Sequence, residues 1–225
     1  MNEQVRTQFN TLSSEYDSFR RLLIPDFDAF YGTGIDCLKY GGAAPAALDV
    51  GAGTGIFAAR LLQRYPAASV ALLDFADNMI EEAREKFAGN QNISYILGDY
   101  SETDLGTNNY DIVISALSLH HLNPAGKRDF FVRLFAALKD GGEFVNADIV
   151  KHSDEELTAR HDAEWTEFVH RNIGDGERYD RFLASKDVDD PSTIEEQLAW
   201  LKAAGFQEAR CIYENLNFAV IYAAK

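Results

Sequence analysis

Short apolar runs alternate with helical patterns through the middle of the chain. The runs are rich in aliphatic and β-branched residues and end at glycine or polar residues, which predicts buried strands. They cover residues 46–50, 70–74, 93–97, 110–116 and 143–149. Between them, apolar residues recur every three or four positions and predict helices. Strand–helix units of about 30 residues are typical of βαβ folding, so we predict an α/β, doubly wound fold with a mostly parallel sheet.

Glycines and polar stretches predict where this core ends. A helix that contains Phe130 is expected to stop at Gly141-Gly142, within a core that covers residues 45–150. Further on, Ser192-Thr193-Ile194-Glu195 has the form of a capping box and predicts the start of a final helix. Within residues 191–225, the segments 209–213 and 218–223 then predict a closing antiparallel hairpin, which makes the sheet mixed.

Two helical segments are expected outside the core. Residues 1–40 predict an N-terminal helical lid, in which apolar residues from Val5 to Tyr16 form one stripe. Residues 151–190 are polar and predict a helical lid insertion. We therefore expect a single domain over residues 1–225, in which a Rossmann-like sheet carries both lids.

Composition and charge narrow the functional classes. Hydrophobic residues make up 46% of the 225 and charged residues 25%, which is ordinary for a globular protein. The formal net charge of −15, with scattered basic residues, disfavours nucleic acid as a partner. The sequence has no apolar run of about 20 residues and no signal pattern at its start, so we expect no membrane association and a cytoplasmic location. Cys37 and Cys211 are expected to be free thiols.

The first predicted strand runs into the glycine-rich segment Asp49-Val50-Gly51-Ala52-Gly53-Thr54-Gly55. Glycines let the backbone turn sharply and approach a ligand, and the next helix offers free N–H groups. The spacing GxGxG differs from the GxGxxG of dinucleotide-binding proteins. With an acid before it, this form favours a ligand that has a carboxylate and an adenosine over one that has a pyrophosphate. A tight turn without any ligand is the plainer alternative.

Acidic residues follow the second and third predicted strands. Asp74 ends the second strand, where a carboxylate can accept hydrogen bonds from two ribose hydroxyls; a solvated strand end is the alternative. Asp99 follows the third strand and can accept a hydrogen bond from the amino group of an adenine, with Tyr100 beside the ring; a plain turn is the alternative. Met79 either covers a face of the adenine or belongs to the core.

Two adjacent histidines follow the fourth predicted strand, in the segment from Ser115 to Leu122. Ligands of such sheets bind outside the carboxyl ends of the strands, so this segment is expected to face the crevice. Imidazole titrates near neutral pH, so His120 or His121 is a candidate general base, and a hydrogen-bonded structural role is the alternative. The three histidines within 151–190 are nine residues apart, a spacing that does not suit one tight helical site, so no metal site is predicted.

Together these motifs resemble those of class I S-adenosylmethionine-dependent methyltransferases. Their order matches over residues 45–150, including a Lys-x-Gly-Gly turn at 139–142 before the fifth strand. The resemblance implies S-adenosylmethionine as cofactor, with Asp49 and the glycines along its methionine part, Asp74 at its ribose and Asp99 at its adenine. The residues expected to contact the cofactor are Tyr16, Arg20, Arg21, Asp49, Gly51, Ala52, Gly53, Asp74, Phe75, Met79, Asp99, Tyr100 and Ser115.

The segment from Tyr16 to Pro25 is similar to the lid helix of bacterial and archaeal small-molecule methyltransferases. An arginine of that helix can pair with the methionine carboxylate, so we expect Arg20 or Arg21 to do so here; two surface arginines are the alternative. Both lids are expected to enclose the methyl acceptor beside His120 or His121. The lining residues predicted for the acceptor pocket are Tyr31, Trp165, Phe168 and Tyr179, with Tyr16 beside them.

The predicted activity is transfer of a methyl group from S-adenosylmethionine to a small-molecule acceptor by in-line displacement. The C-terminal segment is also similar to carboxy-S-adenosylmethionine synthases, but those enzymes need a basic residue for the extra carboxylate, and residues 188–192 are acidic here. A non-catalytic S-adenosylmethionine-binding protein is another alternative. A nucleotide-dependent reductase is a third, which the GxGxG spacing disfavours. The exposed lid helices would also suit a homodimer.

Overall fold

A single seven-stranded sheet organises the protein. The computed structural model describes residues 16–186 and 188–225, and the strand order is β3-β2-β1-β4-β5-β7-β6. The first five strands are parallel, whereas β7 is antiparallel to both β5 and β6. The predicted mixed sheet and closing hairpin are therefore confirmed. The strands are β1 (Ala46–Val50), β2 (Ser69–Asp74), β3 (Ile93–Leu97), β4 (Tyr110–Ala116), β5 (Leu138–Ile149), β6 (Glu208–Asn215) and β7 (Phe218–Ala224).

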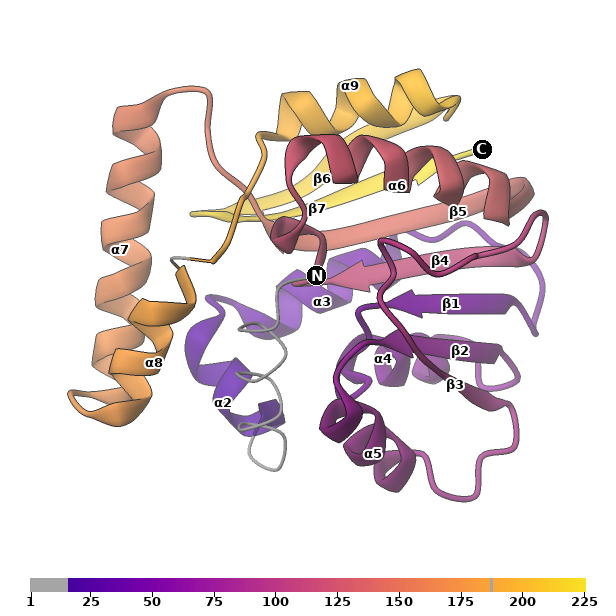
Figure 1. Cartoon of the computed structure of the whole chain (residues 1–225), viewed down its shortest axis with the longest axis horizontal. Coiled ribbons are helices and arrows are strands. Elements are labelled where there is room, and N and C mark those ends of the chain that lie inside the picture. The colour runs from indigo at the N-terminus through magenta and orange to yellow at the C-terminus, as the bar shows by residue number, and fades with distance from the viewer. Residues whose placement is uncertain (1–15, 187) are drawn as a thin grey trace.

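Helices cover both faces of the sheet (Figure 1). Helices α3 and α4 pack on one face together with α5, and α6 and α9 pack on the other. Side chains alternate between the two cores along β4, where Ile112 and Ile114 belong to the first core and Val113 to the second. The helices are α2 (Tyr16–Leu23), α3 (Phe27–Asp36), α4 (Ile56–Arg64), α5 (Asp77–Lys86), α6 (Pro124–Ala137), α7 (Glu155–Ile173), α8 (Glu177–Lys186) and α9 (Ile194–Ala204), with a 3₁₀ turn η2 (Leu119–His121).

Two predicted boundaries are wrong by a few residues. Helix α6 ends at Ala137, before Gly141-Gly142, because the chain enters β5 at Leu138 and passes the glycines as an irregularity in the β4–β5 pairing. The capping box of α9 is formed by Thr193 and Glu196, one residue later than predicted, because Thr193 is the residue with extended backbone at the N-cap. Of the predicted N-terminal stripe, Val5 to Leu12 lie outside the described residues.

The lid helices lie beyond the carboxyl ends of the parallel strands. Figure 1 shows α7 and α8 side by side at that end of the sheet, with α2 next to them. The indole N–H of Trp165 in α7 donates a hydrogen bond to the carbonyl of Leu23 at 2.8 Å, and the amide of Asn172 donates to Leu22 at 2.9 Å. The two lids are thus joined to each other. Within residues 16–186 and 188–225, no helix is long and apolar enough to cross a membrane.

Candidate active site

The glycine-rich segment forms a tight turn between β1 and α4. Gly51, Gly53 and Gly55 have φ angles of 65°, 54° and 80°, which favour glycine. The N–H groups of Gly51 and Ala52 both donate to the carbonyl of Leu73 at the end of β2, at 2.8 and 3.0 Å. A Cβ at Gly51 would lie 1.9 Å from the Ser118 hydroxyl oxygen. The turn therefore brings bare backbone against the β4 segment, where a side chain would not fit.

Two buried carboxylates flank this turn. The Asp74 carboxylate accepts hydrogen bonds from Gly53 N at 2.8 Å and Ala76 N at 2.9 Å, and burial raises its pKa. One oxygen of Asp49 accepts from Ala58 N at 3.0 Å, while its Oδ1 is buried and has no hydrogen-bond partner among the described residues. Burial, with a smaller contribution from the Asp74 charge, raises the pKa of Asp49 to about 7. A cationic or hydrogen-bond-donating ligand fits these groups.

A crevice of about 290 Å³ opens at the carboxyl ends of β1, β2 and β4. Four of the residues predicted to contact the cofactor line it, namely Gly51, Gly53, Asp74 and Phe75. The crevice is lined by Gly51, Gly53, Asp74, Phe75, Leu117, Ser118 and His121.

Other predicted cofactor residues hold the surrounding structure. Tyr100 is buried and donates its hydroxyl to the carbonyl of Ser118 at 2.7 Å, and Ser115 donates to the carbonyl of Val50 at 2.9 Å. Met79 is 1% exposed within α5. Asp99 accepts hydrogen bonds from the backbone and hydroxyl of Ser101, at 2.8 and 2.6 Å, which closes the turn after β3. For Asp99, Tyr100, Ser115 and Met79, contact with a cofactor stays a prediction.

Helix α2 is joined to the glycine-rich turn through Asp17. Its carboxylate accepts a hydrogen bond from Thr54 at 2.5 Å and forms an ion pair with Lys86 at 2.6 Å. The structure also separates the two arginines that the sequence left equivalent. Arg20 lines a cavity beside the site, whereas Arg21 is half-exposed and pairs with Asp28 at 3.3 Å. The backbone of Tyr16 starts α2, and its side chain lies outside what the structure describes.

A second cavity of about 730 Å³ lies between the lids and the sheet. Trp165, which was predicted for the acceptor pocket, lines this cavity, and His121 lines both the cavity and the crevice. Its other lining residues come mainly from α2, α8 and the segment before α9, and include Phe19, Arg20, Leu23, Arg181, Phe182, Val188 and Asp189.

The other three residues predicted for the acceptor pocket lie elsewhere. Tyr31 is 3% exposed and packs its ring against Phe57, with centroids 5.5 Å apart. Phe168 is half-buried against the core on the α3–α4 face. The ring of Tyr179 packs against that of His170 at a tilt of 58°, with centroids 4.9 Å apart. Contact of these three side chains with an acceptor stays a prediction without geometric support.

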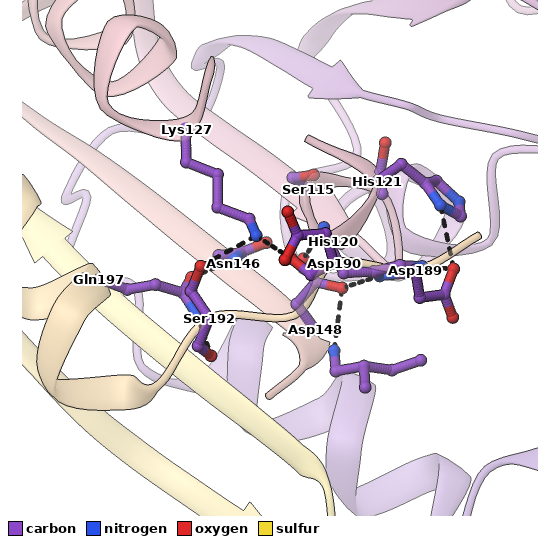
Figure 2. Close-up of polar contacts among 12 residues, drawn as sticks. Ser115, His120, His121, Lys127, Asn146, Asp148, Asp189, Asp190, Ser192 and Gln197 are labelled. Carbon is purple, nitrogen blue, oxygen red and sulfur yellow. Dashed lines mark hydrogen bonds and ion pairs between the residues drawn. The ribbon is translucent and has the colours of Figure 1, made fainter. Parts of the chain in front are cut away.

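Both predicted histidines take part in one buried network with two aspartates (Figure 2). His120 Nδ1 lies 2.5 Å from Asp148 Oδ1, and His120 Nε2 lies 3.4 Å from Asp189 Oδ1. His121 Nδ1 lies 3.1 Å from the same Asp189 oxygen. Burial by itself would lower the pKa of His120, but the charges of Asp148 and Asp189 outweigh it and raise this pKa. Burial, and then the charge of His120, lowers the pKa of His121 to about 4, which leaves it neutral at pH 7.

The segment that carries Asp189 is held in place from η2 and α6. Asp190 N donates to the carbonyl of His120 at 2.8 Å. The buried Lys127 side chain donates to the Asp190 carbonyl and, at 3.0 Å, to the Ser192 hydroxyl (Figure 2). Sequence reasoning missed Asp148 and Asp189 as site residues. The available signal for Asp148 was a charged residue between apolar neighbours near the end of a predicted buried strand.

Comparisons with known proteins find similarity to methyltransferases and to carboxy-S-adenosyl-L-methionine synthases. The profile of a family described as a methyltransferase domain matches residues 47–142. The carboxy-S-adenosyl-L-methionine synthase of Helicobacter hepaticus is 26% identical over 229 residues, covering 95% of this chain and 92% of that protein. A ubiquinone/menaquinone biosynthesis C-methyltransferase of Desulfotalea psychrophila is 28% identical over 144 residues, covering 64% of this chain and 57% of that protein.

A solved S-adenosylmethionine-dependent methyltransferase from Leishmania major has a TM-score of 0.68 at 18% identity, over 99% of this chain and 82% of that chain. At this identity the likeness concerns the fold. The chain spans 26% to 58% of the length of the D. psychrophila enzyme and three other curated relatives.

Fold and site together define a Rossmann-like protein with a ligand crevice at the strand ends and a lidded cavity beside it. Residues 47–142 are similar to the methyltransferase domain family, and the fold of the chain is similar to that of solved S-adenosylmethionine-dependent methyltransferases.

Proposed function

We propose that the protein binds S-adenosylmethionine in the crevice and transfers its methyl group to a small molecule held in the lidded cavity. The observation that carries this proposal is the position of His121, which lines both spaces. A methyl acceptor in the cavity would therefore lie next to the end of the crevice. Bound S-adenosylmethionine supplies a reactive sulfonium methyl group, so the protein contributes mainly by positioning and by excluding water.

The residues of the crevice suit this cofactor. Both carboxylate oxygens of Asp74 accept backbone hydrogen bonds and keep acceptor capacity for ribose hydroxyls. The buried Asp49 Oδ1, which precedes the same turn and has no hydrogen-bond partner among the described residues, would be satisfied, directly or through water, by a cationic ammonium group. Arg20 is the better placed of the two arginines for an anionic group in the cavity, because Arg21 pairs with Asp28 at the surface.

Calorimetric titration with S-adenosylmethionine and S-adenosylhomocysteine tests the cofactor site. We expect 1:1 binding that Asp74→Ala weakens about 100-fold, since two charge-assisted ribose hydrogen bonds at about 1.5 kcal/mol each are lost. Asp140→Asn changes an exposed carboxyl near the start of β5 and is the control, with wild-type affinity expected. S-adenosylhomocysteine release in the presence of candidate acceptors then measures turnover. Absence of binding by the wild type would refute the cofactor assignment.

A carboxy-S-adenosylmethionine synthase-like activity is the second candidate. It is favoured by relatives that match nearly from end to end, such as the H. hepaticus synthase. The segment 188–192 remains acidic, but Arg181 lines the cavity and supplies a basic group from α8. Mass spectrometry of ligand extracted from the purified protein distinguishes the candidates: a species heavier than S-adenosylmethionine by a carboxyl group favours the synthase, and unmodified cofactor favours methyl transfer.

The cavity and the composition of the chain both support a small molecule as the methyl acceptor. A small-molecule acceptor suits the enclosed cavity, and the acidic composition disfavours nucleic acid. The cytoplasmic location and the homodimer stay predictions, which cell fractionation and light scattering would test.

A further inference from the structure

Three side chains that line the lidded cavity bring metal-ligating atoms close together. They are His120, His121 and Asp189, and the atoms that each offers lie within 4.8 Å of one another. Two of these residues are adjacent on η2, and the third comes from the segment before α9. Lys127 and the Asp190–His120 backbone hydrogen bond hold the two segments together, so the arrangement is built into the fold.

The spacing of the three donor atoms matches the coordination shell of a transition metal. A tetrahedral ion with bonds of about 2.0–2.2 Å keeps neighbouring ligand atoms about 3.4 Å apart. The Asp189 oxygen lies 3.4 Å from His120 Nε2 and 3.1 Å from His121 Nδ1. One ligand atom from each of the three residues lies within 4.8 Å of the others, so only a small side-chain adjustment would complete the set.

The outer contacts of His120 are those of a metal ligand. Its Nδ1 lies 2.5 Å from the buried carboxylate of Asp148, which also accepts a hydrogen bond from the His120 backbone at 3.0 Å. A histidine held in this way has its Nδ1 proton on the carboxylate side and turns Nε2 toward the metal. His120 Nε2 is the atom that faces Asp189 and the cavity.

The charges around the cluster also favour a cation. Asp148 and Asp189 surround two imidazoles, so a divalent ion bound to neutral histidines would be balanced by two carboxylates. The charge of Arg20 acts on both His120 and Asp189 and opposes the ion. Because Arg20 and Arg181 line the cavity, an anionic acceptor lying over the metal would offset this repulsion.

We propose that His120, His121 and Asp189 form a divalent transition-metal site whose open coordination positions face the lidded cavity. Two imidazoles and one carboxylate with open positions are a ligand set for zinc or ferrous iron. The role of the metal rests on the proposed function: it would coordinate an oxygen of the methyl acceptor, such as a hydroxyl or a keto acid oxygen, and lower the pKa of that group. The acceptor class would then be small molecules with a metal-binding oxygen and a negative charge.

Zinc titration of chelator-treated protein tests the site without cofactor or acceptor. We expect a stoichiometry of one zinc per chain by calorimetry, and a visible absorption band when cobalt(II) is bound instead. Asp189→Ala and His121→Ala should each weaken zinc binding at least 100-fold, and Asp148→Asn should weaken it about 10- to 100-fold by releasing His120. His170→Ala removes a half-exposed histidine outside the cavity and should bind zinc as the wild type does.

Two results would overturn the proposal: no zinc or cobalt binding by the wild type, or equal binding by Asp189→Ala. Circular dichroism melting of Asp189→Ala shows whether the variant is folded, and His121→Ala repeats the test on another element. Titration of Asp189→Ala with S-adenosylmethionine keeps the two proposals apart. If Asp189→Ala loses zinc binding but still binds the cofactor, the result supports the metal site independently of the cofactor site. If the wild type binds zinc but not the cofactor, the proposed function is refuted and the metal site is not.

Discussion

The buried Asp49 carboxyl makes the stability of the protein depend on pH in a predictable direction. It is 1% exposed, one of its oxygens lacks a partner among the described residues, and burial raises its pKa from 3.8 to about 7. The neighbouring Asp74 charge raises this pKa, whereas Lys86 and the Ala58 N–H lower it. Replacement by asparagine keeps the shape and the acceptor for Ala58 N but removes the titration.

The magnitude follows from linkage between protonation and folding. Because the folded pKa is above the unfolded value, the unfolded chain loses this proton first as the pH rises. Stability is therefore lost between pH 3.8 and about 7 and is constant above that range. From pH 5 to pH 8, the loss for this group is about 2.5 kcal/mol. The Asp49→Asn variant escapes it, so its free energy of unfolding relative to wild type should rise by that amount over the same interval.

Urea denaturation of both proteins without cofactor, at pH 5, 6, 7 and 8, measures this difference. Taking the difference between the proteins cancels most other titrations, and any constant effect of the asparagine N–H₂ group shifts all four points equally. Asp140→Asn, at an exposed carboxyl, is the control and should give a flat difference. A flat profile for Asp49→Asn, or one that falls with pH, would show that Asp49 is ionised at little cost and that the linkage reasoning is mistaken.

Two further changes test the glycine-rich turn and the hydrogen bonds of Lys127. In Gly51→Ala, the new Cβ would lie 1.9 and 2.4 Å from Ser118 side-chain atoms and would add about 1 kcal/mol of backbone strain, so we expect calorimetry to detect no cofactor binding. The control is Gly89→Ala, where φ is a similar 86° but the space around the residue is open, and it should bind the cofactor normally. Lys127→Met keeps the apolar part of the side chain but removes its hydrogen bonds to the Asp190 carbonyl and the Ser192 hydroxyl, so the free energy of unfolding measured with urea should fall by about 1–3 kcal/mol. A change under about 0.5 kcal/mol would mean that these hydrogen bonds contribute little to stability.

The parts of the fold that could be predicted are those set by local pattern. The parallel strands, the glycine-rich turn and Asp74 follow from runs and motifs whose meaning depends on a few neighbouring residues. The end of α6 was missed because Gly141-Gly142 is a helix-stop signal in sequence, whereas pairing with β4 at Leu138 extends β5 back across it. Here a tertiary contact overrides the local signal.

The site was predicted only as far as single motifs reach. His120 and His121 were found because they follow a strand, but their partner Asp189 comes from a segment that no local pattern connects to them. The acidity of residues 188–192 was interpreted only as the lack of a basic group. The expectation of no metal site considered the histidines of 151–190, and the structure pairs two of these, His152 and His161, with each other at 2.9 Å.

The four buried aspartates of the site form two pairs with different surroundings. Asp49 and Asp74 lie at the glycine-rich turn, and burial raises the pKa of each, so the empty crevice carries a cost that a cationic ligand would relieve. Asp148 and Asp189 instead lie around the histidines at the cavity, where imidazole already meets them. A ligand charge is therefore needed at the crevice more than at the histidines. This difference favours the proposed placement of positively charged S-adenosylmethionine at the glycine-rich turn, whereas a metal at the histidines would bind to their neutral forms, so that Asp148 and Asp189 balance its charge.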